Sequence, residues 1–294
     1  NERKVNLHTI IKVKVHNAKE GDKLVPAIIE TTVGRVLFNQ HVTKKAGYIN
    51  ELLTKKSLRD IISDIMKKTD MAQTAKFLDE IKDDASQIFI LGDLFDFWYE
   101  YKKVVPKGFI RILGKLAELS DAGIEMHFFV GNHDMWMSGY FENELNIKVY
   151  HNPKEFDLCG KKFFIGHGDG LGPGDHRYKF IKKVFRNKFS QWLFGIFHPG
   201  FGIGVANYFS SKSRAAIGKT DEQFLGADKE WLIIFSREML KTKHYDYFIV
   251  GHRHLPIDFK LTDATRYINL GDWIKYNSYV VFDGKDVELK FYTT

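Results

Sequence analysis

The sequence has a single cysteine, Cys159, and no apolar run that approaches the length of a membrane-spanning helix. One thiol cannot form an internal disulfide, which excludes a small secreted fold held together by disulfides. The missing apolar run argues against a membrane-spanning architecture. We therefore predict a reducing, cytoplasmic setting in which Cys159 is a buried structural thiol.

The first six residues carry neither an initiator methionine nor the basic, apolar and small-residue zones of a signal peptide. We therefore expect the sequence to begin inside a longer protein. Its 294 residues suffice for one large α/β domain or two smaller ones. The formal net charge of +7 predicts an anionic partner, which nucleic acid, a phosphorylated metabolite or an anionic membrane surface would satisfy.

The N-terminal part has the pattern of a β-hairpin followed by helices. Residues 7–15 and 28–38 are apolar runs of strand type, separated by a charged segment that contains glycine. From 48 to 82 apolar residues recur every three to four positions, which predicts two helices broken near Thr69 and Asp70. The basic residues of these helices form either a nucleic-acid patch or solvated helix faces: Lys55, Lys56, Arg59, Lys67 and Lys68.

Two phrases of this part, TTVGRVLFN at 31–39 and GYINELLTKKSLRDII at 47–62, closely resemble an internal stretch of the β′ subunit of bacterial RNA polymerases. The resemblance covers roughly residues 1–82. The Asp-rich loop with which that family binds catalytic Mg²⁺ does not occur in this sequence, so polymerase activity is not implied. The resemblance ends before Asp83, within 75–82, and no Pro/Gly/Ser-rich linker separates the halves. We therefore predict a chimeric reading frame rather than a natural fusion.

In the C-terminal part, four apolar strand-like runs each end in glycine and a polar residue. The runs are 87–91, 124–130, 162–165 and 247–250, and the polar residues after them are Asp93, Asn132, His167 and His252. In open α/β folds the carboxyl ends of the strands meet at one ligand-binding rim, and glycine permits the sharp turns there. Carboxylate, amide and imidazole donors favour Mn²⁺, Fe or Zn²⁺ over an all-oxygen Mg²⁺ site. Phosphatases typically hold two such ions about 4 Å apart.

In chain order the motifs Gly-Asp, Gly-Asn-His-Asp, Gly-His and Gly-His-x-His resemble those of the calcineurin-like phosphoesterases. The resemblance implies five metal ligands, which are Asp93, Asn132, His167, His252 and His254. Asp93 would bridge two ions, and His254 would belong to the first site. The resemblance also implies two catalytic residues, His133 as a stabiliser of the transition state and Asp134 as the partner that orients it.

That family has an earlier strand that ends in Asp-x-His and completes the first metal site. Upstream of Asp93 the histidines are His8, His16 and His41, and none follows an aspartate by two residues. The polymerase-like segment stands where this strand should be. The resemblance therefore implies two divalent ions, expected to be Mn²⁺, with a first site that keeps only Asp93 and His254 and a sheet that lacks a central strand.

Between His167 and His252 lies an insert that is basic, aromatic and partly helical. Lysine and arginine are interleaved with Phe, Ile and Trp over 176–189 and 192–197, and 202–216 follow. This pattern fits an amphipathic element on a membrane surface or a lid that holds acyl chains. It fits an ordinary helical subdomain with snorkelling lysines equally well.

The phrase GDLFDFW at 92–98 and this insert resemble the UDP-2,3-diacylglucosamine hydrolases, whose insert is a lid over a diacyl substrate. The resemblance implies phosphate or glucosamine contacts in the lid, for which the candidates are Lys212, Arg214 and Lys219. Many members of that group carry arginine where this chain has His133. A related phosphoesterase with another phosphate ester substrate therefore stays open.

Together these features predict an α/β fold, a calcineurin-like four-layer αββα sandwich over 83–294 with a helical lid at about 175–218. A small β-hairpin and helices over 1–82 would precede it. Strands near the carboxyl end of the sequence would close the second sheet. Asp272, just before them, is either a further metal ligand or a turn residue, and we predict a turn residue.

The implied reaction is metal-dependent hydrolysis in lipid A synthesis, in which water attacks the α-phosphorus of UDP-2,3-diacylglucosamine. The products would be UMP and 2,3-diacylglucosamine 1-phosphate, or lipid X. We expect an impaired activity at the cytoplasmic face of the inner membrane, with the lid on the membrane surface. The alternatives are an inactive chimeric product and a phosphoesterase with another substrate, while nucleic acid is not the expected partner.

Overall fold

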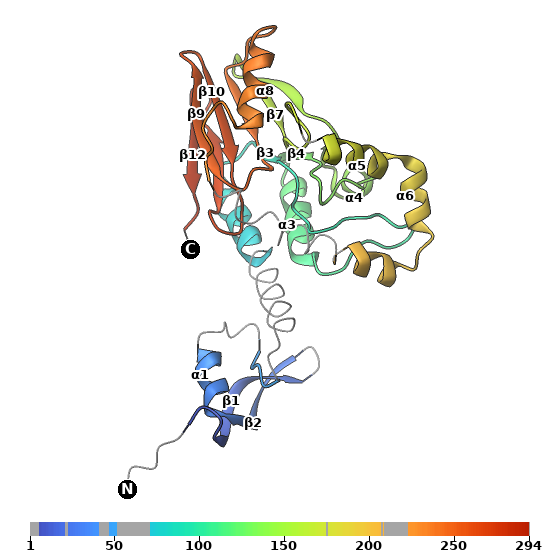
Figure 1. Cartoon of the computed structure of the whole chain (residues 1–294), viewed down its shortest axis with the longest axis vertical. Coiled ribbons are helices and arrows are strands. Elements are labelled where there is room, and N and C mark those ends of the chain that lie inside the picture. Colours follow the sequence, from blue (N-terminus) through green and yellow to red (C-terminus); the bar gives the residue numbers. More distant parts are fainter. Residues whose placement is uncertain are drawn as a thin grey trace. The chain divides into compact units, whose positions relative to one another are not determined.

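In the computed structural model, the described residues are 6–20, 23–40, 47–51, 71–174, 176–206, 208 and 223–293 (Figure 1). They belong to two compact units, Asn1–Gln73 and Thr74–Thr294. The division between the units falls inside the helical residues 71–81. The expected domain limits, 1–82 and 83–294, and the chimeric origin of the chain remain predictions.

The N-terminal unit contains the predicted β-hairpin. β1 (Ile10–Glu20) pairs antiparallel with β2 (Lys23–Thr32), and a bulge lies between Val15 and Ala18. Of the helices predicted over 48–82, residues 52–70 lie outside the described part of the chain, together with all five candidate basic residues of a nucleic-acid patch.

The second predicted strand is wrong beyond Thr32, because residues 33–38 belong to helix α1 (Val33–Gln40). The Thr32 hydroxyl accepts a hydrogen bond from the backbone N–H of Arg35 at 3.3 Å, as an N-capping residue does. Short apolar runs fit a strand and a buried helix face equally, and here the cap decides for the helix.

The C-terminal unit is centred on a five-stranded sheet with the order β6-β7-β8-β10-β9. Its strands are β6 (Lys154–Leu158), β7 (Lys161–Gly166), β8 (Tyr247–Val250), β9 (Pro256–Thr262) and β10 (Thr265–Leu270). β8 runs parallel to both β7 and β10, while β6 and β9 are antiparallel to their neighbours. The parallel arrangement brings the carboxyl ends of β7 and β8 to the same rim.

A second layer of strands packs on one face of this sheet in two pieces. One piece is a parallel sheet of β3 (Gln87–Ile90), β4 (Glu125–Phe129) and β5 (Lys148–Tyr150). The other is the antiparallel hairpin of β11 (Ser278–Phe282) and β12 (Val287–Phe291). Within the described part of the chain, no strand pairs with the second edge of β3.

The core between the two layers is aromatic and aliphatic. Phe89 of β3 packs edge-on against Phe156 of β6, and Phe282 of β11 packs against Phe163 of β7, with ring centroids 5.1 and 5.0 Å apart. These contacts and the buried Leu91, Phe129, Ile165, Ile249 and Ile268 form one cluster. The two pieces of the second layer therefore share one core, although they do not pair with each other.

Helices cover the outer faces of both layers. α8 (Trp231–Leu240) packs on the five-stranded sheet through Leu232 and Ile233, next to Phe164 and Phe248. On the other side lie α3 (Ile110–Asp121), α4 (Tyr140–Leu145) and the helical residues 74–81. Phe128 of β4 packs against Phe141 of α4, with ring centroids 5.0 Å apart. The order helix, sheet, sheet, helix confirms the predicted αββα sandwich.

The described part of the insert is largely helical, as the sequence predicts. It contains α5 (His176–Arg186), α6 (Lys188–Gly195) and the helical residues 199–206. The proposed substrate contacts Lys212, Arg214 and Lys219 lie outside the described residues. None of the helices that the structure describes has both the length and the apolar character needed to cross a membrane.

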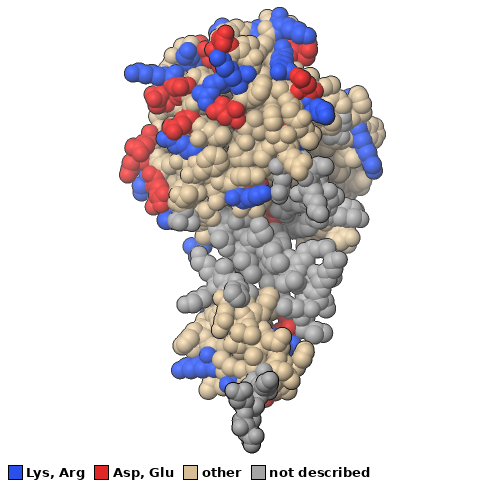
Figure 2. Space-filling model, turned by 60° about the vertical axis from the view of Figure 1, so that its left-hand side comes forward, with Lys and Arg blue, Asp and Glu red and all other residues tan. Residues whose placement is uncertain are grey.

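The surface differs from the sequence-based expectation at Cys159, and its charges are mixed. The prediction that Cys159 is buried is wrong, because Cys159 is exposed in the turn between β6 and β7, where its φ is 51°. On the face of the C-terminal unit that Figure 2 shows, basic and acidic side chains are intermingled. The net positive charge is therefore not gathered into one basic patch on that face.

Candidate metal centre

The loops after β3 and β4 approach each other so closely at Gly92 and Gly131 that neither position has room for a side chain. A Cβ at Gly92 would lie 2.6 Å from the backbone N of Gly131, and a Cβ at Gly131 would lie 2.2 Å from Asp93 Oδ1. Gly92 also has a φ of +82°, a conformation that glycine adopts at low cost. Both glycines are therefore needed to bring Asp93 alongside the Asn132 loop.

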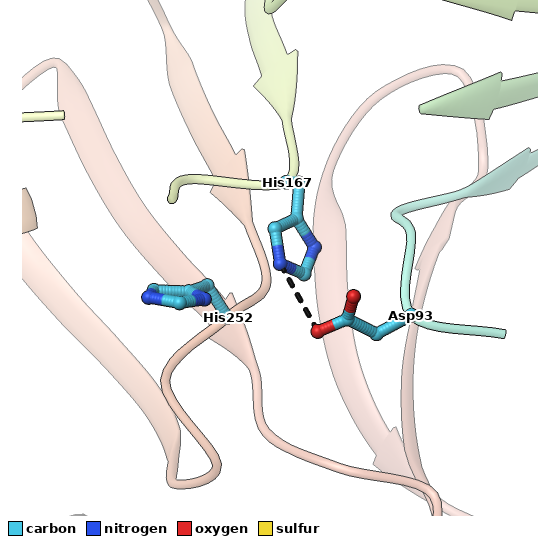
Figure 3. Close-up of side chains that lie close together, drawn as sticks. All are labelled: Asp93, His167 and His252. Atoms are coloured by element: carbon cyan, nitrogen blue, oxygen red, sulfur yellow. Dashed lines mark ion pairs between the residues drawn. The ribbon is translucent and has the colours of Figure 1, made fainter. Parts of the chain in front are cut away.

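Three of the predicted ligands converge at the rim. The donor atoms of Asp93, His167 and His252 all lie within 4.8 Å of one another, and Figure 3 shows the three side chains around one point. Asp93 Oδ2 is 3.3 Å from His167 Nε2. Each ligand follows the carboxyl end of a strand, β3, β7 or β8, as the sequence predicts.

Asn132 brings a fourth donor to the same point. Its Oδ1 lies 3.2 Å from His167 Nε2 and 3.0 Å from His252 Nδ1. Two oxygens and two imidazole nitrogens from four strand ends make a donor set that suits a divalent transition metal. We conclude that Asp93, Asn132, His167 and His252 fit one metal ion.

The orientation of the His167 ring is fixed by the backbone. His167 Nδ1 lies 2.6 Å from the carbonyl oxygen of Leu91. Because a carbonyl oxygen only accepts hydrogen bonds, Nδ1 carries the proton and Nε2 is turned toward Asp93 and Asn132. Metal-binding histidines are commonly held in this way by a second hydrogen bond.

Asp93 and His167 each change the pKa of the other, and both change the pKa of His252. Burial opposes the imidazolium form of His167, but the Asp93 carboxylate outweighs it and raises the pKa of His167 to about 9. Burial would likewise raise the pKa of Asp93, yet His167 holds that pKa well below its usual range. Burial and the nearby His167 charge lower the pKa of His252 to about 4. At neutral pH His167 is therefore protonated on both ring nitrogens, and its positive charge faces the Asp93 carboxylate.

The candidate catalytic residues lie beside these ligands. The backbone N–H of His133 donates to Asp93 Oδ1 at 2.8 Å, and its ring Nδ1 lies 3.2 Å from the carbonyl oxygen of Asp96. Asp134 is fully buried and accepts hydrogen bonds from the backbone N–H groups of Gly131 at 2.7 Å and Leu94 at 3.0 Å. Through these bonds Asp134 acts on the backbone that carries His133.

Asp134 differs from Asp93 in its electrostatic surroundings. Burial, and then repulsion from Asp93, raise the pKa of Asp134 to about 7. Its two backbone hydrogen bonds favour the charged form but do not offset these effects. Negative charge in the centre is therefore concentrated on Asp93, where the histidines converge.

The structure places His254 outside the group of three converging side chains. His254 Nδ1 lies 3.6 Å from Asp272 Oδ2, and its side chain is 41% exposed. Asp272 Oδ1 accepts hydrogen bonds from the backbone N–H groups of residues 274, 275 and 276, which is the behaviour of a turn residue. Asp272 thus both caps a turn and faces His254, and the assignment of His254 to a first metal site remains a prediction.

Two residues that hold the His252 loop were not predicted from the sequence. His252 has a φ of 66°, and the next residue, Arg253, forms an ion pair with the buried Glu230 through Nε and Nη2, both at 3.2 Å. Asn269 Nδ2 donates to the carbonyl oxygens of Arg253 at 2.6 Å and Leu255 at 3.2 Å. Glu230 and Asn269 belong to no motif, so only the fold reveals them.

Comparison with known proteins matches residues 60–256 to the model of the calcineurin-like phosphoesterases. A UDP-2,3-diacylglucosamine hydrolase of Porphyromonas gingivalis is 40% identical over 228 residues, which cover 74% of this chain and 87% of that protein. A protein of the same name from Shewanella sp. (strain W3-18-1) is 26% identical over 73% of this chain and 86% of its own length.

A second kind of relative matches a separate segment. The β′ subunit of the DNA-directed RNA polymerase of Parabacteroides distasonis is 49% identical over 82 residues, or 28% of this chain. The chain spans only 6% of the length of that subunit. Both resemblances predicted from the sequence are thereby confirmed.

We expect Glu230→Gln to weaken the binding of Mn²⁺ or Zn²⁺ about tenfold, because Arg253 loses its counter-charge and the loop that carries His252 loosens. Isothermal titration calorimetry on the full chain measures the affinity, and circular dichroism checks the fold. Asp228→Asn is the matched control, since it breaks the exposed Arg237–Asp228 pair at 2.7 Å. Unchanged affinity in a folded Glu230→Gln protein would contradict this role.

Proposed function

The chain belongs to the calcineurin-like phosphoesterase family, and we propose that it hydrolyses the pyrophosphate bond of UDP-2,3-diacylglucosamine with an impaired activity. The products are UMP and 2,3-diacylglucosamine 1-phosphate, or lipid X. The observation that carries the proposal is the convergence of Asp93, His167 and His252, with Asn132 beside them. The choice of substrate rests on the two relatives in Porphyromonas and Shewanella, which are both named UDP-2,3-diacylglucosamine hydrolase.

In this proposal Asp93, Asn132, His167 and His252 hold one divalent ion, which we expect to be Mn²⁺. Such an ion supplies positive charge that polarises the phosphoryl group and acidifies a water molecule. Asp93 also fixes His133 through the backbone hydrogen bond at 2.8 Å. His133 Nδ1 donates to the carbonyl oxygen of Asp96, so Nε2 is the ring atom left for the substrate. In the imidazolium form, which carries a proton on both nitrogens, Nε2 donates a hydrogen bond or a proton to a phosphoryl oxygen.

We attribute the impairment to the first metal site. The family would fill this site with four protein ligands, of which this sequence retains Asp93 and His254. His254 is engaged by Asp272 at 3.6 Å, a partner that does not replace an Asp-x-His strand. Asp93, Asn132, His167 and His252 would then hold one ion, without the second ion that two-metal phosphatases use.

We further propose that the lid binds acyl chains and rests on the cytoplasmic face of the inner membrane. Five large apolar side chains of the lid are 61–67% exposed: Phe180, Phe189, Trp192, Ile196 and Phe201. Exposed lysines and arginines lie among them on α5 and α6, namely Arg177, Lys183 and Lys188. An apolar surface bordered by basic residues suits both acyl chains and anionic headgroups.

The main alternative is a non-catalytic chimeric product. It is favoured by the missing Asp-x-His motif and by the separate polymerase-like segment. A related phosphoesterase with another phosphate ester substrate is a further alternative, because His133 stands where many UDP-2,3-diacylglucosamine hydrolases carry arginine. Nucleic acid remains the less favoured partner.

The test of the proposal combines metal content with hydrolysis of UDP-2,3-diacylglucosamine in added Mn²⁺. We expect about one tightly bound ion per chain and a slow turnover that Asp93→Ala lowers at least tenfold, because Asp93 is the anionic ligand. Asp263→Ala is the control, since Asp263 is fully exposed and pairs only with Lys260 at the surface among the described contacts.

Turnover equal in the wild type and Asp93→Ala would identify the chain as the non-catalytic product. Two tightly bound ions with turnover that depends on Asp93 would contradict the proposed impairment, because other residues would then have rebuilt the first site. Turnover of a simple phosphate monoester in place of the diacyl substrate would favour the related phosphoesterase.

For the lid we expect Phe189→Ser and Trp192→Ser each to weaken binding to vesicles of mixed zwitterionic and anionic phospholipid about tenfold, because each removes an exposed aromatic ring from the apolar surface. A vesicle sedimentation assay measures the bound fraction. Phe291→Ser is the control, because Phe291 is 54% exposed on β12, away from the insert. An equal loss in all three variants would show nonspecific apolar binding.

A further inference from the structure

The loop that carries His167 continues into a buried carboxylate that plays no part in the proposed reaction. Asp169 lies two residues beyond His167 and is 5% exposed. Its Oδ2 accepts a hydrogen bond from the Tyr178 hydroxyl at 2.6 Å and forms an ion pair with Lys182 Nζ at 2.6 Å. Lys182 Nζ also donates to the Asp169 carbonyl oxygen at 2.8 Å.

The two partners of Asp169 both come from the lid. Tyr178 and Lys182 are four residues apart on α5, so they project from the same face of the helix. Lys179, on the next position around the helix, donates to the carbonyl oxygen of Gly172 at 2.5 Å. Three side chains of α5 thus bind the single loop that follows β7.

The same contacts place α5 beside the metal centre. The ring of Tyr178 lies 6.2 Å from the ring of His252, measured between centroids. Gly168 and Gly170 have φ values of +105° and +69°, so glycine allows the turns that bring Asp169 back under the helix. His167, a candidate metal ligand, and Asp169, which binds the lid helix, are thus only two positions apart in the chain.

The ion pair between Asp169 and Lys182 is largely buried, so its loss should weaken the attachment of α5 to the loop. The side chains of Lys182 and Asp169 are 17% and 5% exposed, so removal of one partner leaves a largely buried charge on the other. An exposed pair of the same kind would contribute little. The Tyr178 hydroxyl donates a hydrogen bond to the same carboxylate, so two side chains of the helix bind Asp169.

We propose that Asp169, Tyr178 and Lys182 form a latch that fixes the lid helix α5 to the metal-binding loop and couples the position of the lid to occupancy of the metal centre. Tyr178 and Lys182 are positioning residues in this arrangement. Its consequence for the substrate rests on the proposed function, but the coupling itself does not. Because coupling is reciprocal, an ion bound by His167 orders α5, and a loosened α5 weakens the binding of the ion.

Hydrogen–deuterium exchange on the full chain tests the latch directly. In the wild type, added Mn²⁺ should slow exchange of the α5 amides at least fivefold, along with those next to His167. In Tyr178→Phe the slowing at α5 should be lost, while the slowing next to His167 persists. Tyr178→Phe removes one hydroxyl and keeps the ring, so the fold is retained. Val184→Ala, at a 40% exposed position on the same helix, is the control and should show the same metal-dependent slowing as the wild type.

Lys182 provides the second arm of the test. Lys182→Met should raise exchange at α5 even without metal and weaken Mn²⁺ binding about tenfold in calorimetry, and Lys182→Arg should restore most of both because the charge is kept. Equal slowing of α5 by Mn²⁺ in the wild type and Tyr178→Phe would overturn the coupling. So would a wild-type α5 that does not respond to bound metal. Metal-dependent slowing without turnover would leave the latch standing and reject the proposed function alone.

Discussion

The metal centre depends on the contact between the two loops that follow β3 and β4. Asp93 reaches the donor atoms of His167 only because Gly131 leaves room for its carboxylate, where a Cβ would lie 2.2 Å from Oδ1. Asp134 then joins the two loops through hydrogen bonds to the backbone of Gly131 and Leu94. This arrangement keeps Asp93 in a left-handed conformation, with φ 54°, which costs about 1 kcal/mol or more for a residue other than glycine. Strain at a ligand is tolerable where the surrounding contacts are this numerous.

From that contact follows the distribution of charge. The pKa values of the two buried carboxylates in the β3 and β4 loops shift in opposite directions. Burial would raise the pKa of Asp93, but His167 keeps Asp93 charged, whereas burial and repulsion from Asp93 raise the pKa of Asp134 to about 7. A third carboxylate, Asp169, is neutralised by Lys182 from the lid. Of these three carboxylates, Asp93 is the one that lies among candidate metal ligands, His167 and His252. Burial opposes the charged form of Asp169, but His167 and then Lys182 outweigh it and lower the pKa of Asp169, so the lid contact and the converging ligands interact electrostatically as well as through the chain.

Much of this could be predicted from the sequence, because the ligands follow apolar strands in a fixed order. Gly92-Asp93 and Gly166-His167 are local patterns, and strand direction alone brings them to one rim. Contacts such as Glu230 with Arg253 or Lys182 with Asp169 join positions that no local pattern relates, so only the fold reveals them. The errors have the same origin. The run at 33–38 fits strand and helix alike, and the exposure of Cys159 follows from a tight turn between β6 and β7 that its apolar character does not indicate.

The fold and the chemistry of this chain depend on different residues. The shared core is formed by contacts such as Phe282 on Phe163 and Phe89 on Phe156, none of which involves a metal ligand. These contacts hold both pieces of the second layer against the five-stranded sheet, even though β3 pairs on one edge only within the described chain. The apolar core, rather than the candidate metal ligands, therefore stabilises the layers of the sandwich. Membership of the family is shown by the matched family model and by the relative in Porphyromonas gingivalis, whereas the proposed chemistry rests on the few side chains that converge at the strand ends.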